Sequence, residues 1–187
     1  MSPGSKPGPL AANQTMTLQE LAYTESILYS DTIDISSRQQ TDESKKRLEE
    51  IHLEYRKIHQ RYADLSSQQT EALKRGLFIQ WYSLTEPYWL TGINGLNENA
   101  ENEILNSLNQ IILLDKCDFE IIWMFNYYWS VGDWTFTRLK AFKQFDQRII
   151  NEQNHSLPKT IDRQAMAARG QMGKYWNSLT HFSKPLY

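Results

Sequence analysis

The most regular feature of the sequence is a series of apolar and tyrosine side chains that alternate three and four positions apart. The series is Leu48, Ile51, Tyr55, Ile58, Tyr62 and Leu65. This is the a/d spacing of a heptad, which places all members on one face of a helix. No glycine or proline occurs from Thr41 to Arg75, so we predict one long amphipathic helix over this range. Its apolar seam has two candidate partners: other helices of the same bundle, or the same seam of a second copy in a homodimer.

Helical periodicity and capping residues predict the other elements. Thr17 and Glu20 form a capping-box pattern that starts a helix over about 17–30. Further helices are predicted over about 100–115, 119–131, 134–150 and 160–179, and Pro87 and two glycines predict a loop over 86–99. No strand-like alternation is present. We therefore predict an all-α fold, a single-domain helical bundle of five or six helices over 15–182, with a disordered leader (1–14) and a tail (183–187).

Aromatic residues are concentrated between Trp123 and Trp134, in the stretch WMFNYYWSVGDW. The helix predicted there is apolar on nearly every side, which is typical of a central, buried helix. Asp118 is its candidate N-cap and Gly132 its candidate left-handed stop. Asn126 and Ser130 interrupt it one turn apart, so each needs a hydrogen-bond partner.

Core packing, a partner surface and a ligand pocket all remain open for these aromatics. Tyr88 and Trp89, in the predicted loop, would either fold back on the core or form a contact surface. The candidate ligand-binding or partner-contact residues are Tyr88, Trp89, Asn126, Tyr127, Ser130, Asp133, Trp134 and Arg138. The candidate dimer seam is the heptad series named above.

Charge and cysteine content narrow the function classes. The formal net charge is −2, which argues against a nucleic-acid partner. Charged residues are mostly acidic over 76–133 and mostly basic over 134–187. Either the two parts lie together in the fold, or the basic faces near Arg138–Arg148 and Arg163–Lys174 attract an acidic partner. The single Cys117 excludes an intramolecular disulfide and indicates a reducing, cytoplasmic setting. The longest apolar run is too short for membrane insertion.

Catalytic and metal motifs find little support. The spacing Glu-x-x-His, used by ferritin-like di-metal carboxylate enzymes, occurs at Glu49–His52 and Glu152–His155. In the heptad frame Glu49 faces water and His52 lies at the margin, so neither points into a bundle. His59, one heptad on, is likewise predicted to be a solvated flank residue. Neither a nucleophile elbow nor a phosphate-binding loop is present. We therefore predict no catalytic residues, metal ligands or cofactor.

These observations favour a non-catalytic intracellular protein that acts by protein–protein interaction, as a homodimer or as an adaptor. The first alternative is a helical bundle that binds a small ligand in an aromatic pocket. The second is a di-metal carboxylate enzyme, which the heptad geometry disfavours.

Overall fold

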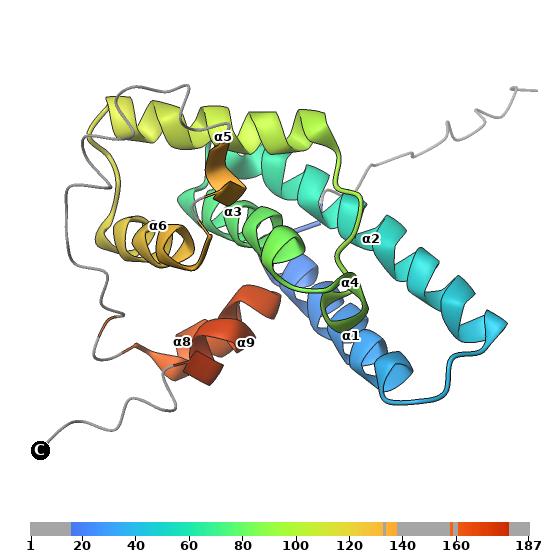
Figure 1. Ribbon diagram of the computed structural model, residues 1–187. Helices are drawn as coiled ribbons and strands as arrows, with labels where there is room; N and C mark the ends of the chain where they lie inside the picture. The colour runs from blue at the N-terminus through green and yellow to red at the C-terminus, as the bar shows by residue number, and fades with distance from the viewer. Residues whose placement is uncertain (1–15, 133, 138–157, 159–160, 180–187) are drawn as a thin grey trace, which may run out of the picture.

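The computed structural model describes residues 16–132, 134–137, 158 and 161–179. All regular structure in these ranges is helical, with no strand, which confirms the all-α prediction. Figure 1 shows the arrangement of the helices. They are α1 (Leu18–Ser36), α2 (Asp42–Ser66), α3 (Thr70–Thr85), α4 (Tyr88–Thr91), α5 (Glu98–Leu113), α6 (Phe119–Gly132), α8 (Arg163–Ala167) and α9 (Gly170–Leu179). The described part thus holds more helices than the five or six predicted.

The long helix predicted from the heptad pattern is two helices, so that prediction was wrong. The backbone N–H groups of Gln68 and Gln69 both bond the carbonyl of Leu65, which closes the end of α2. Residues 67–70 are exposed, so no buried apolar face holds them in a continued helix. The chain then turns back, and Gly76 of α3 lies against Tyr62 of α2 and Ile104 of α5. An added Cβ at Gly76 would lie 2.5 Å from the Ile104 Cδ1, which explains the glycine at this crossing.

The heptad seam packs inside the chain. Five of its six side chains are buried, and the sixth, Leu65, packs partly buried at the edge of the same core. Helix α2 contacts α1, α3 and α5, which cover this face. The spacing therefore identified the buried stripe correctly. Because the stripe is already covered, it offers no free surface to a second copy.

The central helix is α3, not the aromatic helix α6 as predicted. Every residue over 72–81 is buried, and α3 contacts α2, α4, α5, α6 and α9 (Figure 1). Helix α6 is buried on one side, while Ser130 and Val131 near its end are exposed. Its buried rings form the aromatic core with α3 and α9: Trp81 stacks on Tyr128 with centroids 4.6 Å apart, and Trp123 meets Trp176 edge to face at 4.7 Å. Core packing thus accounts for most of the aromatic stretch.

Helix ends follow the predicted caps in some places and differ in others. The Thr17–Glu20 capping box is present, although α1 runs on to Ser36. The Asp118 side chain accepts from the N–H of Ile121 at 2.8 Å, as an N-cap does. Gly132 is not left-handed; among the described glycines only Gly92, Gly95 and Gly170 have positive φ. The predicted 160–179 helix is two helices: α8 ends at Ala167, and α9 begins at Gly170, whose φ is +64°. Of the predicted 134–150 helix, 134–137 form a 3₁₀ turn and the rest lies outside the described residues.

Candidate binding surfaces

A single helical turn with two aromatic residues, α4, follows α3 and packs against α1. Tyr88, Trp89 and Leu90 of α4 are 43%, 47% and 43% exposed. The next residue, Thr91, is fully buried, and Gly92 ends the turn in the left-handed conformation at φ +76°. We call the three exposed residues the α4 patch. The sequence predicted that these rings either fold back on the core or form a contact surface. The structure leaves both rings partly exposed, with the Tyr88 ring against His52.

Contacts on both sides hold the α4 patch in place. The Ser36 hydroxyl donates to the carbonyl of Trp89, which ties the turn to the end of α1. The ring of Tyr88 lies edge to face on His52 of α2, with centroids 5.5 Å apart. A Cβ at Gly92 would meet Thr32 Oγ1 at 2.5 Å, so the backbone there lies directly on α1. The turn is therefore fixed to the core although its side chains face solvent.

A buried polar network anchors the same turn from below. The Gln171 Nε2 donates to the carbonyl of Thr91 at 3.1 Å, and the Tyr55 hydroxyl donates to Gln171 Oε1 at 2.9 Å. The backbone N–H of Gln171 donates to Glu25 Oε2 at 2.9 Å, and the Tyr62 hydroxyl donates to Glu25 Oε1. Burial raises the pKa of the Glu25 carboxyl to about 7. The network joins α1, α2, α4 and α9, and we interpret it as structural.

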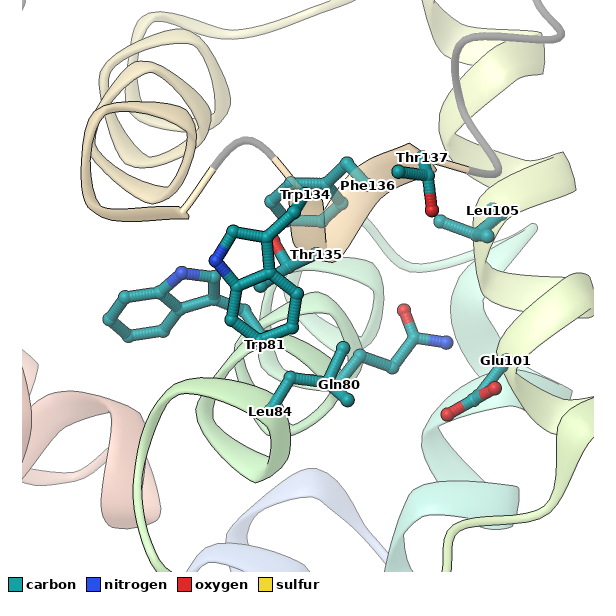
Figure 2. A pocket seen from close by; sticks show the side chains of 9 residues that line it. All are labelled: Gln80, Trp81, Leu84, Glu101, Leu105, Trp134, Thr135, Phe136 and Thr137. Atoms are coloured by element: carbon teal, nitrogen blue, oxygen red, sulfur yellow. The ribbon is translucent and has the colours of Figure 1, made fainter.

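A pocket of 320 Å³ opens between α3, α5 and the 134–137 turn (Figure 2). Its walls combine aromatic, aliphatic and polar side chains: Gln80, Trp81, Leu84, Glu101, Leu105, Trp134, Thr135, Phe136 and Thr137. Gln80 is only 6% exposed, and neither its amide oxygen nor its amide nitrogen has a hydrogen-bond partner. Trp134 is 55% exposed and forms one side of the opening.

Of the predicted contact residues that the structure describes, only Trp134 lines this pocket. Tyr127 is committed to the core, where its hydroxyl lies 2.8 Å from the Tyr175 hydroxyl. Ser130, predicted to be buried, is exposed and donates to the carbonyl of Tyr127 in its own helix. Asn126 is buried. Asp133 and Arg138 lie outside the described residues.

Sequence reasoning missed the polar residues of the pocket. Gln80 is one of the buried stretch of α3, and its neighbours Ile79 and Trp81 are apolar core residues. A single amide within such a stretch was a readable signal. Glu101 gave none, because an acidic residue in the first turn of a helix is ordinary.

Both histidines of α2 are buried, so the prediction of solvated flank residues was wrong. The ring of Tyr88 covers His52. Neither ring nitrogen of His52 or of His59 has a hydrogen-bond partner. Burial lowers the pKa of both, that of His59 to about 4. The buried face of α2 is therefore wider than its a/d seam, because α4 and α5 cover the adjoining positions.

At the Glu-x-x-His pattern of Glu49 and His52, the two side chains lie in different surroundings. His52 Nδ1 lies 3.7 Å from Glu49 Oε2, while Glu49 itself faces solvent. Among the residues that the structure describes, His, Cys, Asp and Glu form no group of three that could hold a metal ion. Glu152 and His155 lie outside those residues.

The acidic and basic parts of the chain meet in an ion-pair cluster. Arg169, between α8 and α9, contacts Glu71 at 2.5 Å and also pairs with Glu120. Lys74 contacts Glu120 at 2.5 Å and Asp118 at 2.6 Å. The basic C-terminal segment thus offsets acidic residues inside the fold. Of the predicted basic faces, Arg163 and Lys174 are exposed, and Arg138–Arg148 is outside the described range.

No protein-family model, curated protein or solved structure matches the chain. Within the described ranges, no helix has both the length and the apolar character that a membrane crossing requires. Likeness to other proteins therefore contributes nothing to a functional assignment, which rests on surface geometry.

Proposed function

We propose that the protein is a non-catalytic binding protein that engages another protein through the α4 patch. The observation that carries this proposal is the exposure of three successive large apolar side chains, Tyr88, Trp89 and Leu90, at 43–47%. Exposed apolar groups that are contiguous mark interaction sites more often than single ones do. Tryptophan and tyrosine are also the side chains that most often dominate binding energy at interfaces.

The anchoring of the turn supports the proposal. A flexible segment loses conformational freedom when it binds, and that loss reduces affinity. Here Ser36, Gln171 and Gly92 fix the backbone before any partner arrives. The partner we infer is a folded protein with an apolar groove that receives Trp89 as its anchor. The buried seam of α2 plays no part in this interface. The reducing cytoplasm as the setting belongs to the same proposal, because the sequence has one cysteine.

The test compares Trp89→Ala and Tyr88→Ala with Tyr23→Ala, which removes an aromatic ring that is 70% exposed on α1. Tagged chains are expressed at equal levels in cells, and the proteins that co-purify stoichiometrically are quantified by mass spectrometry. We expect a partner to be depleted at least tenfold with the α4 variants and retained with Tyr23→Ala. Equal recovery with all variants, or no stoichiometric partner, contradicts the proposal.

Self-association is a separate outcome of the same test. Light scattering over a range of concentrations measures the mass of the wild-type chain and of Trp89→Ala. A mass above the 22.0 kDa of one chain that falls with Trp89→Ala identifies a second copy as the partner. A dimer that persists in Trp89→Ala would exclude the α4 patch as its interface.

A further inference from the structure

A buried histidine is in direct contact with the α4 patch. His52 of α2 is 1% exposed, and neither nitrogen of its imidazole has a hydrogen-bond partner. Buried polar groups in native proteins are almost always hydrogen-bonded, and histidine is the side chain whose charge changes closest to neutral pH. The ring of Tyr88 lies edge to face on this imidazole, with centroids 5.5 Å apart. One of the exposed rings of the patch therefore rests on a titratable group that the fold leaves unpaired.

The surroundings of His52 favour the neutral imidazole while the Tyr88 ring is in place. Burial lowers the pKa of His52; the Glu49 carboxylate acts against this change, and the Arg56 guanidinium adds to it. Both charged groups are on α2, and from α4 the phenol ring of Tyr88 faces the imidazole. Glu49 Oε2 lies 3.7 Å from His52 Nδ1, beyond hydrogen-bond distance, and the Glu49 side chain is 72% exposed. An imidazolium held in this contact would lack the hydrogen bonds that a buried charge requires.

The Tyr88 ring can move without the backbone that carries it. The carbonyls of Trp89 and Thr91 accept hydrogen bonds from α1 and α9, which anchor the turn. The Tyr88 side chain is 43% exposed, so part of its surface already faces solvent. Rotation of this side chain away from α2 would open His52 to water, where the charged form is solvated. The ring therefore has two alternatives, on the imidazole or in solvent, above one fixed backbone.

We propose that His52 is a pH switch for the α4 patch: the neutral imidazole keeps the Tyr88 ring in place, and protonation releases the ring into solvent and weakens partner binding. Linkage gives the direction, because the state in which His52 is harder to protonate loses population as pH falls. The consequence for binding rests on the proposed function. A ring that has left its position must be ordered again when the partner binds, which reduces affinity.

Two other buried groups near α2 can be separated from His52. Burial lowers the pKa of His59 to about 4, so this ring stays neutral down to about pH 5. Glu25 does titrate near neutral pH, because burial raises its pKa to about 7. Its network reaches the carbonyl of Thr91 through Gln171. The variant Glu25→Gln removes that titration and leaves His52 unchanged.

The first test follows the Tyr88 ring in the full chain without a partner. A fluorine-19 label is placed on this ring, and its resonance is recorded in H₂O and in D₂O from about pH 7.5 to about pH 5. The difference between the two solvents measures how far water reaches the ring. We expect exposure to increase as pH falls, with a midpoint below 6.5, the ordinary pKa of histidine, in the wild type and in Glu25→Gln alike. The same label on Tyr23 of α1, which is 70% exposed, is the control and should show no transition.

The variants His52→Gln and His52→Leu assign the transition to His52. Gln keeps a polar side chain that does not ionise, and Leu fills the site with an apolar one, so either folded variant suffices. We expect the exposure of the label on Tyr88 to be independent of pH in both. A transition that persists in these variants, or a wild-type ring whose exposure does not change with pH, overturns the switch.

The second test measures the consequence for binding, with the protein that co-purifies with the tagged chain. Its dissociation constant is compared at about pH 7.5 and about pH 5.5 for the wild type and His52→Gln. We expect wild-type binding to weaken at the lower pH by about fivefold or more beyond any change in His52→Gln, the lower limit usual for coupled sites. Equal pH dependence in the two chains overturns the regulation of binding. If no partner is recovered, the proposed function fails, while the label on Tyr88 still decides whether His52 is the switch.

Discussion

The buried carboxyl of Glu25 makes a quantitative prediction about pH and stability. The side chain is 1% exposed, and burial raises its pKa from the ordinary 4.5 to about 7 even though Tyr62 and Gln171 donate hydrogen bonds to it. The groups around it that carry charge are Arg75 and Lys174, which partly offset the effect of burial. Between pH 4.5 and 7 the folded state therefore binds more protons at this site than the unfolded state does.

The sign and the size of the Glu25 contribution to the free energy of unfolding follow from the linkage between proton binding and folding. Stability falls with rising pH wherever the folded state holds the extra proton. A pKa difference of 2.5 corresponds to about 3 kcal/mol, at about 1.4 kcal/mol for each tenfold change. The contribution of Glu25 is thus full at or below pH 4.5, and is lost as pH rises through 7.

His59 acts in the opposite direction. Burial lowers its pKa from 6.5 to about 4, so the unfolded state binds the extra proton between these values. Stability from this group rises as pH increases from 4 to 6.5, again by about 3 kcal/mol. The pKa of His52 is also lowered by burial and has the same sign. In the wild-type chain these opposing contributions offset each other in part.

The variant Glu25→Gln isolates the carboxyl, because an amide retains an acceptor oxygen for the Gln171 N–H and does not ionise. Urea unfolding of both chains is measured from pH 4.5 to 8. We expect the free energy of unfolding of the wild type, relative to Glu25→Gln, to fall by about 3 kcal/mol over this range. Glu103→Gln, an exposed position of α5, controls for the general replacement of a carboxylate. A wild-type-minus-variant difference that stays constant with pH would refute the reasoning.

Three further predictions concern stability and assembly. Gly170→Ala should lower the free energy of unfolding by about 1–3 kcal/mol, because Gly170 has φ +64° and an added Cβ would lie 2.5 Å from Glu25 Oε2. Gly95→Ala is the control: Gly95 has φ +60°, but the nearest atom to an added Cβ is 3.5 Å away, so the loss in urea unfolding should be about 1 kcal/mol. Equal losses of stability in the two variants would contradict the close contact at Gly170. Arg169→Met should cost about 2 kcal/mol, because Glu71 and Glu120 lose charge-assisted hydrogen bonds, and a neutral result in chemical unfolding would show that the ion-pair cluster contributes nothing. Ile58→Ala should lower the free energy of unfolding by about 2–4 kcal/mol, because it leaves a cavity in the core. The mass of the protein by light scattering should not change. A changed oligomeric state at unaltered stability would instead indicate that the α2 seam is a dimer interface.

Local sequence patterns were enough to predict those features of the fold that depend on residues close together in the chain. The Thr17 capping box, the Asp118 cap and the apolar stripe of α2 each depend on residues a few positions apart, and each was predicted. Periodicity shows which face of a helix is buried but not what covers it. For this reason the sequence could not decide whether other helices of the same chain or a second copy covers the α2 seam. For the same reason the burial of His52 and His59 was missed.

Features that arise from distant contacts were not predictable. Glu25 is buried by Tyr62 and Gln171, which lie 37 and 146 positions away, and nothing near Glu25 in the sequence marks it as buried. The break between α2 and α3, after Ser66, contains no glycine or proline that would mark it in the sequence. The Ser66 Oγ lies 2.7 Å from the Ser107 Oγ of α5, a contact that forms only in the folded chain. At the candidate sites, the exposure of Trp89 and the orphaned amide of Gln80 likewise depend on how α3, α4 and α5 are placed.

The most direct test of the proposed function is photo-crosslinking from the α4 patch in living cells. A photoreactive phenylalanine analogue replaces Trp89 in one chain and the exposed Tyr23 of α1 in another. We predict one discrete crosslinked protein from position 89, lost when Tyr88→Ala and Leu90→Ala are added, and absent from position 23. The same products from both positions, or none from position 89, would contradict a binding role for the α4 patch.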